Sequence, residues 1–158
     1  MGLDTLASII AKIVKLVLNF IILILYRVGF AGGFLGVGGT WNLYEEKSSD
    51  VEIIASGIFV GYFVYTAVSL ISACIANSDN RNTFTDILMN IVGVFLWISV
   101  GATALHYWHG YLSEHKYTYV NSERQVGLAL GSLCVLNGAV YLVDSVISVI
   151  FLIKTKFQ

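Results

Sequence analysis

The chain has 158 residues, of which 57% are hydrophobic and only 12% are charged. A soluble domain carries about 25% charged residues, so this composition excludes an ordinary water-soluble fold and indicates lipid as the solvent. The net charge of −1 excludes a strongly basic nucleic-acid-binding surface. Proline is absent, which favours long uninterrupted helices. We therefore predict an all-α integral membrane protein.

The first hydrophobic segment has ends that the sequence leaves open. Residues 16–26 are apolar apart from one asparagine, which is only about half of a membrane crossing. The helix can extend backward through two lysines, or forward past Arg27 into the glycine-rich stretch 29–39. A secretory signal cleaved within that stretch is a third alternative. Because the region before the apolar run is long for a signal peptide, we predict a retained span over about residues 14–35.

Three further spans are long and apolar. They cover residues 53–76, 87–108 and 126–153, and Asp144 is the only charged residue of the last. With the first span they predict a single four-span domain over residues 1–158, a four-helix bundle with both termini on one side.

The distribution of basic residues predicts the orientation of the bundle. The rule that cytoplasmic flanks are positively charged places the side with more lysine and arginine inside the cell. The side of the termini carries Lys12, Lys15, Arg81, Lys154 and Lys156, and the other side carries Lys47, Lys116 and Arg124. We predict cytoplasmic termini, outer loops around residues 36–52 and 110–125, and a short inner turn over 77–86.

Two charged residues are expected inside the membrane. Arg27 lies 12 residues after the preceding lysine, and Asp144 lies 10 residues before the following one. Both are then roughly 15–18 Å from the cytoplasmic boundary. A charge near the bilayer centre costs about 2.5–3.5 kcal/mol, so we expect an ion pair between the first and fourth helices. The alternative is that Arg27 extends to the outer surface while Asp144 is protonated or bonds to Asn90 or Asn137.

Glycines at four-residue spacing form a second signal. Such spacing lets helix backbones approach closely in lipid. The pairs are Gly57 with Gly61, Gly127 with Gly131, Gly29 with Gly33, and Gly32 with Gly36. They can pack helices within one bundle or contact neighbouring membrane proteins, and both interpretations stay open.

The first outer loop combines aromatic and acidic side chains. Trp41 and Tyr44 suit a position at the membrane interface, with Glu45 and Glu46 in water. The loop either anchors the chain at the bilayer or offers a surface to a partner.

No pattern in the chain predicts an enzyme. Nucleotide-binding loops, nucleophile triads and metalloprotease helices are absent from the sequence. His106 and His109 share a helical face, but interface histidines without a metal are far commoner than metal sites. We expect no catalytic residues, no cofactor, no metal and no small-molecule substrate.

Three strings of residues resemble a known family. They lie in the segment 26–43, which contains YRVG and FLGVGGTWNL as one interrupted string, in VGATALHYW at 100–108, and in SERQVGLA at 122–129. The chain resembles the snakeskin family, the small four-span proteins of arthropod smooth septate junctions, over nearly its whole length.

The resemblance implies a structural component of the smooth septate junction in the plasma membrane of gut-type epithelia. Such proteins assemble with a tetraspanin and with the larger adhesion protein Mesh to seal the paracellular route, and the family has no catalytic residues. Claudins are similar in span count and in a tryptophan-bearing first loop, but theirs carries a cysteine pair that is missing here. The short loops favour a lateral role within one membrane. The alternatives are a channel or small transporter subunit, and a sorting tetraspan of the MARVEL type.

Overall fold

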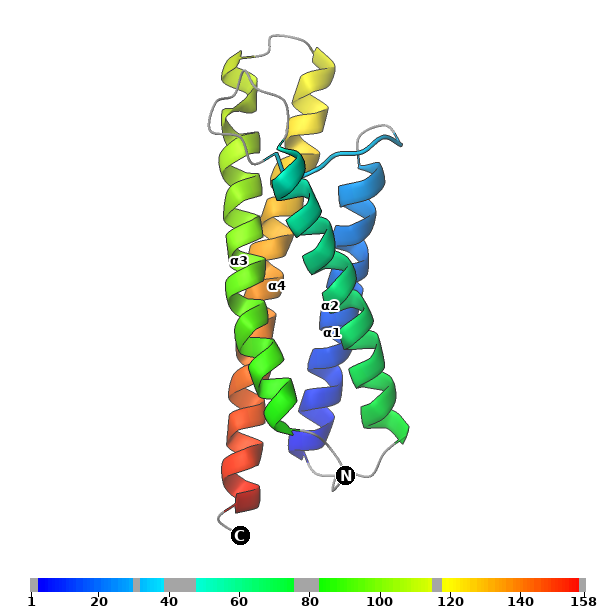
Figure 1. Ribbon diagram of the computed structural model, residues 1–158, viewed down its shortest axis with the longest axis vertical. Helices are drawn as coiled ribbons and strands as arrows, with labels where there is room; N and C mark the ends of the chain where they lie inside the picture. The colour runs from blue at the N-terminus through cyan, green and yellow to red at the C-terminus, as the bar shows by residue number, and fades with distance from the viewer. Residues whose placement is uncertain (1–2, 30–31, 39–47, 76–82, 115–117, 157–158) are drawn as a thin grey trace.

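Four long helices make up the structure. The computed structural model describes residues 3–29, 32–38, 48–75, 83–114 and 118–156. The helices are α1 (Leu3–Val28), α2 (Ser49–Ile75), α3 (Thr83–Glu114) and α4 (Thr118–Lys156) (Figure 1). Each contains a stretch long and apolar enough to cross a membrane, namely Leu6–Val28, Ser49–Ile75, Phe84–Gly110 and Arg124–Lys154. The predicted helical four-span fold is confirmed.

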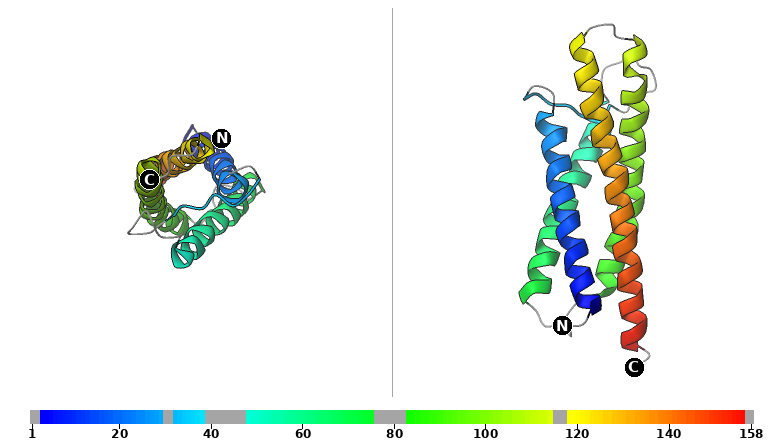
Figure 2. Two further views of the ribbon diagram at one scale, coloured as in Figure 1. Left: turned by 90° about the horizontal axis from the view of Figure 1, so that it is seen from above. Right: turned by 180° about the vertical axis from the view of Figure 1, so that it is seen from behind.

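The helices form a ring. Each helix lies beside its neighbours in sequence, and α1 returns to pack against α4 (Figure 2). The start of α1 and the end of α4 lie at the same end of the bundle (Figure 1), as an even number of crossings requires. The placement of this end in the cytoplasm stays a prediction.

Charged residues lie where the helix dipole favours them. Asp50 and Glu52 are in the first turn of α2, and Asp86 is in the first turn of α3. Lys154 and Lys156 are in the last turn of α4. Negative charge at the amino end and positive charge at the carboxyl end of a helix are each stabilising, and they mark where these helices begin and end.

Glycines bring α3 and α4 into close backbone contact. A methyl group added at Gly101 of α3 would lie 2.9 Å from the carbonyl oxygen of Gly131 on α4. One added at Gly131 would lie 3.0 Å from the backbone nitrogen of Leu105, and one at Gly127 would enter the ring of Trp108. The predicted pair Gly127 and Gly131 therefore packs helices inside this bundle. Lipid supplies no hydrophobic drive for this contact, so close van der Waals packing must stabilise it.

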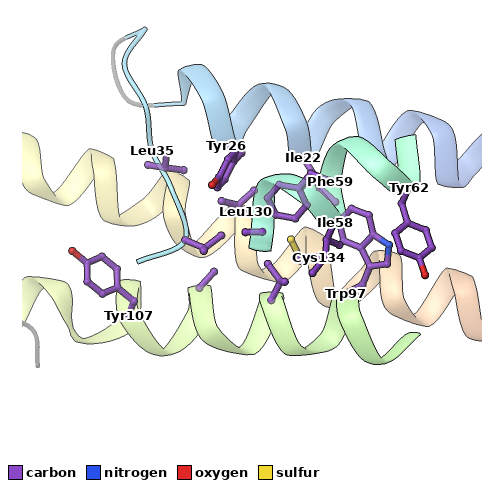
Figure 3. Packing of buried hydrophobic residues seen from close by; sticks show 14 of the residues in the cluster. Ile22, Tyr26, Leu35, Ile58, Phe59, Tyr62, Trp97, Tyr107, Leu130 and Cys134 are labelled. Atoms are coloured by element: carbon purple, nitrogen blue, oxygen red, sulfur yellow. The ribbon is translucent and has the colours of Figure 1, made fainter. Parts of the chain in front are cut away.

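Aromatic side chains bridge the wider gap between α2 and α3. Phe59 of α2 stacks on Trp97 of α3 with ring centroids 5.4 Å apart. Trp97 also stacks on Tyr141 of α4 at 6.1 Å, and Tyr62 of α2 meets Tyr141 edge to face at 5.4 Å. Figure 3 shows Phe59, Trp97 and Tyr62 gathered between the helices. Rings at such separations attract one another beyond their burial, so this layer joins three helices.

The first helix differs from the predicted span over residues 14–35. It begins at Leu3, takes in both lysines, and ends at Val28. The chain then turns back into the bundle, where Leu35 and Val37 are fully buried. Gly32, Gly36 and Gly38 have positive φ angles of 76–81°, which a continuing right-handed helix excludes. Residues 32–38 are not helical. The pairs Gly29 with Gly33 and Gly32 with Gly36 therefore do not lie together on one face of a helix.

The second predicted outer loop is largely helical. α3 continues to Glu114 and α4 begins at Thr118, so most of residues 110–125 extend the two helices. Similarly, α3 begins at Thr83 within the predicted inner turn. Uncharged length locates the part of a helix that lies in lipid, but a helix can continue into water beyond it.

We predict that Gly101→Val destabilises the fold by about 1–3 kcal/mol, because its branched side chain would push against the α4 backbone. The measurement is the free energy of unfolding of the purified protein in detergent micelles. Gly57→Val is the matched control, since nothing lies within 4 Å of a methyl group added there. Equal stability of the two variants would contradict the proposed backbone contact.

Candidate functional site

A buried ionic network lies in the half of the bundle nearer the termini. Lys15 Nζ of α1 donates to Asp144 Oδ2 of α4 at 2.5 Å and to Asn90 Oδ1 of α3 at 2.9 Å. Asn90 Nδ2 donates to the same Asp144 oxygen at 3.1 Å. Lys12 Nζ lies 3.6 Å from Asp86 Oδ2 and 3.7 Å from Asp144 Oδ2. Three helices thus meet at two positive and two negative side chains.

These charges are withdrawn from solvent and lipid alike. Asp144 is 0% exposed, Lys12 1% and Lys15 3%. The outer surface of the bundle is apolar by contrast, with side chains such as Ile53 and Phe95 more than two-thirds exposed. An unpaired buried charge would cost several kcal/mol, so the network is tolerated because its charges balance and because Asp144 Oδ2 accepts two hydrogen bonds. The other carboxylate oxygen, Oδ1, is buried without a hydrogen-bond partner among the described residues.

The second helix joins the network through hydroxyl groups. Tyr65 donates to Asp86 Oδ1 at 2.7 Å and Ser69 donates to the same oxygen at 3.3 Å. Tyr62, one turn earlier, donates to the carbonyl oxygen of Met89 at 3.0 Å. Hydrogen bonds to a charged acceptor are stronger than neutral ones, so Asp86 links α2 firmly to α3 despite the wide backbone separation.

A second, uncharged layer lies one turn further along α1. Asn19 Nδ2 donates to Thr66 Oγ1 at 3.3 Å and to the Tyr141 hydroxyl at 3.2 Å. Asn137 Nδ2 donates to Asn19 Oδ1, and the hydroxyls of Thr66 and Tyr141 are 3.0 Å apart. Lys15 Nζ lies 4.5 Å from the centroid of the Tyr141 ring, which connects the two layers by a cation–π contact.

The expected pairing of Arg27 with Asp144 is wrong. Arg27 is exposed, and Lys15 and Lys12 neutralise Asp144 instead. The two depths match only if Lys15 marks the membrane boundary, whereas α1 continues past it to Leu3 and Lys15 lies level with Asp144. Arg27 is 12 residues further along α1, a rise of about 18 Å. The alternative bond from Asn90 to Asp144 is present.

The burial of Lys12 and Lys15 is not expected from the sequence, because lysines at the edge of an apolar run are typical of a cytoplasmic flank. A signal for their burial exists in their spacing. Polar residues recur at intervals of three and four along an otherwise apolar helix, which places them on one face. They are Ser8, Lys12, Lys15 and Asn19 on α1, and Asn137, Tyr141, Asp144 and Ser148 on α4.

The other residues predicted from the sequence lie in different parts of the structure. Gly57 and Gly61 are exposed on α2, with open space where a side chain would begin. Gly29 approaches Val126 of α4, and Gly33 is half-buried after the end of α1. His106 and His109 are exposed, and within the described ranges no group of His, Cys, Asp and Glu is arranged to hold a metal. The outer-loop residues Trp41, Tyr44, Glu45 and Glu46 lie outside the described residues.

We predict that Lys15→Met and Asp144→Asn each destabilise the bundle by about 3–5 kcal/mol, because each leaves one uncompensated buried charge. The double variant should regain a large part of this loss, since Lys12 and Asp86 still balance. Unfolding free energies in mixed micelles measure the cycle, with Arg27→Leu as the control at an exposed position. Additive losses in the double variant would contradict charge pairing.

Comparison with known proteins gives the chain its family. No protein-family model and no solved structure matches it. It is 55% identical to the protein named snakeskin of Bombyx mori over 153 residues, covering 97% of this chain and 98% of that one. It is 51% identical to snakeskin of Drosophila melanogaster over 149 residues, covering 94% of this chain and 92% of that one. At this identity and coverage, the chain belongs to the snakeskin family.

Proposed function

We propose that this protein is a structural component of smooth septate junctions that assembles laterally with other junction membrane proteins and has no catalytic activity. The observation that carries the proposal is the full-length match to two snakeskin proteins. The partners that the resemblance implies are a tetraspanin and a Mesh-like adhesion protein. Their assembly would seal the paracellular route in the lateral plasma membrane.

The short connections between helices support a lateral role. The link from α1 to α2 covers residues 29–48, and the link from α3 to α4 covers only 115–117. A link of about 20 residues going out and back reaches at most roughly 35 Å even when fully extended. An immunoglobulin-type domain needs about 100 residues. Adhesion to the opposite cell therefore falls to a partner with a larger outer domain.

The open glycine pair on α2 is the surface we propose for such a partner. Gly57 and Gly61 face outward, whereas Gly127 and Gly131 are covered by α3. Valines flank the pair on the exposed face at Val60 and Val64. Small residues with β-branched neighbours form a shallow groove into which a second transmembrane helix can pack.

We predict that Gly57→Leu abolishes co-purification with the tetraspanin and the Mesh-like partner without lowering the protein's own stability. The leucine would fill the groove, and outside its own stretch of α2 no atom of another described residue lies within 4 Å of the position of its Cβ. Ala102→Leu is the matched control, because Ala102 is an exposed small residue on α3. Full retention of both partners by Gly57→Leu would contradict this surface.

A channel or small transporter subunit is the second candidate, and the polar interior favours it. That interior, however, meets the aromatic layer formed by Phe59, Trp97 and Tyr62, whose side chains are at most 5% exposed. We predict no ion flux across proteoliposomes that contain only this chain, measured with a fluorescent ion indicator. Sustained flux would support the channel.

A sorting role of the MARVEL type is tested by locating a tagged protein in a polarised epithelium. Retention of the tagged protein in intracellular membranes would support that role.

A further inference from the structure

The chain segment after α1 crosses the inside of the ring. Residues 35–38, here called the strap, follow the helix and run inward toward α3 (Figures 2 and 3). Leu35 and Val37 are both 0% exposed and belong to the hydrophobic core with Tyr26, Phe59 and Trp108. A connecting segment normally runs over the surface, because burial removes its backbone groups from water.

Four successive backbone N–H groups of the strap are bonded to two acceptors. The amides of Leu35 and Gly36 donate to the carbonyl oxygen of Tyr26 at 3.1 and 3.3 Å. The amides of Val37 and Gly38 both donate to Glu52 Oε1 at 2.8 Å. Consecutive amides around residues of positive φ form a concave anion site, and here the anion is a side chain of the same protein.

Glu52 is itself held in position. Its other carboxylate oxygen, Oε2, accepts a hydrogen bond from the Tyr26 hydroxyl at 2.5 Å. It lies in the first turn of α2, where the helix dipole stabilises negative charge. One carboxylate thus connects the end of α1, the strap and the start of α2.

Two glycines make this contact possible. A methyl group added at Gly36 would lie 2.7 Å from Glu52 Oε1, and one at Gly38 would lie 2.2 Å from the Tyr107 ring on α3. Both residues also have positive φ. The strap therefore fits between α2 and α3 only without side chains at these two positions.

We propose that the Glu52 carboxylate holds the strap in place and so closes the bundle at the end away from the termini. Loss of the hydrogen bonds between Glu52 and the strap then admits water to the core beneath. The ionic network occupies the opposite half, so the strap and the aromatic layer together isolate it from this end. Hydrogen bonds to a charged group hold the closed state, and the strap is the segment that opens first.

The test places a thiol on the strap by Val37→Cys in a Cys74→Ser background, leaving buried Cys134 as an internal reporter. The protein is reconstituted in nanodiscs, where both faces are open, and treated with a membrane-impermeant maleimide. Mass spectrometry then follows each thiol separately. With Glu52 present, both thiols should react slowly. Adding Glu52→Ala should speed labelling of the introduced thiol about 10- to 100-fold while Cys134 stays protected.

Asp50→Ala is the matched control, because Asp50 is an exposed acid in the same helical turn. Glu52→Gln, which keeps an acceptor oxygen but loses the charge, should give an intermediate rate. Unchanged labelling in Glu52→Ala would overturn the proposal. So would equal acceleration at Cys134 in both Glu52 variants, because the bundle would then open as a whole.

Discussion

Hydrocarbon solvates the outside of this bundle and cannot solvate the charge of Lys15 or Asp144. Every other feature of the interior adjusts to that constraint. The two side chains meet at 2.5 Å, and a second pair of opposite charge, Lys12 and Asp86, lies beside them. Breaking a buried ion pair is costly. Sliding α1 along α3 and α4, or rotating it about its own axis, would break these pairs, so one position of α1 is favoured. The polar network thereby specifies how the helices are arranged, which apolar contacts in lipid would do only weakly.

The remaining helix contacts complement the network in different ways. α3 and α4 approach through Gly101 and Gly131, so their contact is close and depends on shape. α2 stands further from α3 and reaches it with long side chains, such as Tyr65 bonded to Asp86. At the end away from the termini, the described residues include a different contact, in which the Glu52 carboxylate fastens the buried strap. The two ends of the bundle are therefore stabilised by different interactions.

Polar and aromatic side chains occupy the interior of the bundle. The interior polar groups bond to one another across all four helices, and the aromatic layer around Trp97 fills the middle of the bundle. The lipid-facing helix surfaces are where we propose that partners bind. The open glycines Gly57 and Gly61 of α2 are the part of that surface where another helix can approach most closely.

The amino-acid sequence by itself determined the number of crossings, because a run of apolar residues long enough to span a bilayer is expected to form a membrane-spanning helix. It also identified Asp144 as an interior charge in need of a partner. Only the tertiary structure decided that the partner is Lys15 rather than Arg27, because helix periodicity shows which residues share a face but not which level of one helix stands opposite another. The role of Glu52 was likewise hidden, since it depends on backbone amides that residues 35–38 present only after folding back into the ring.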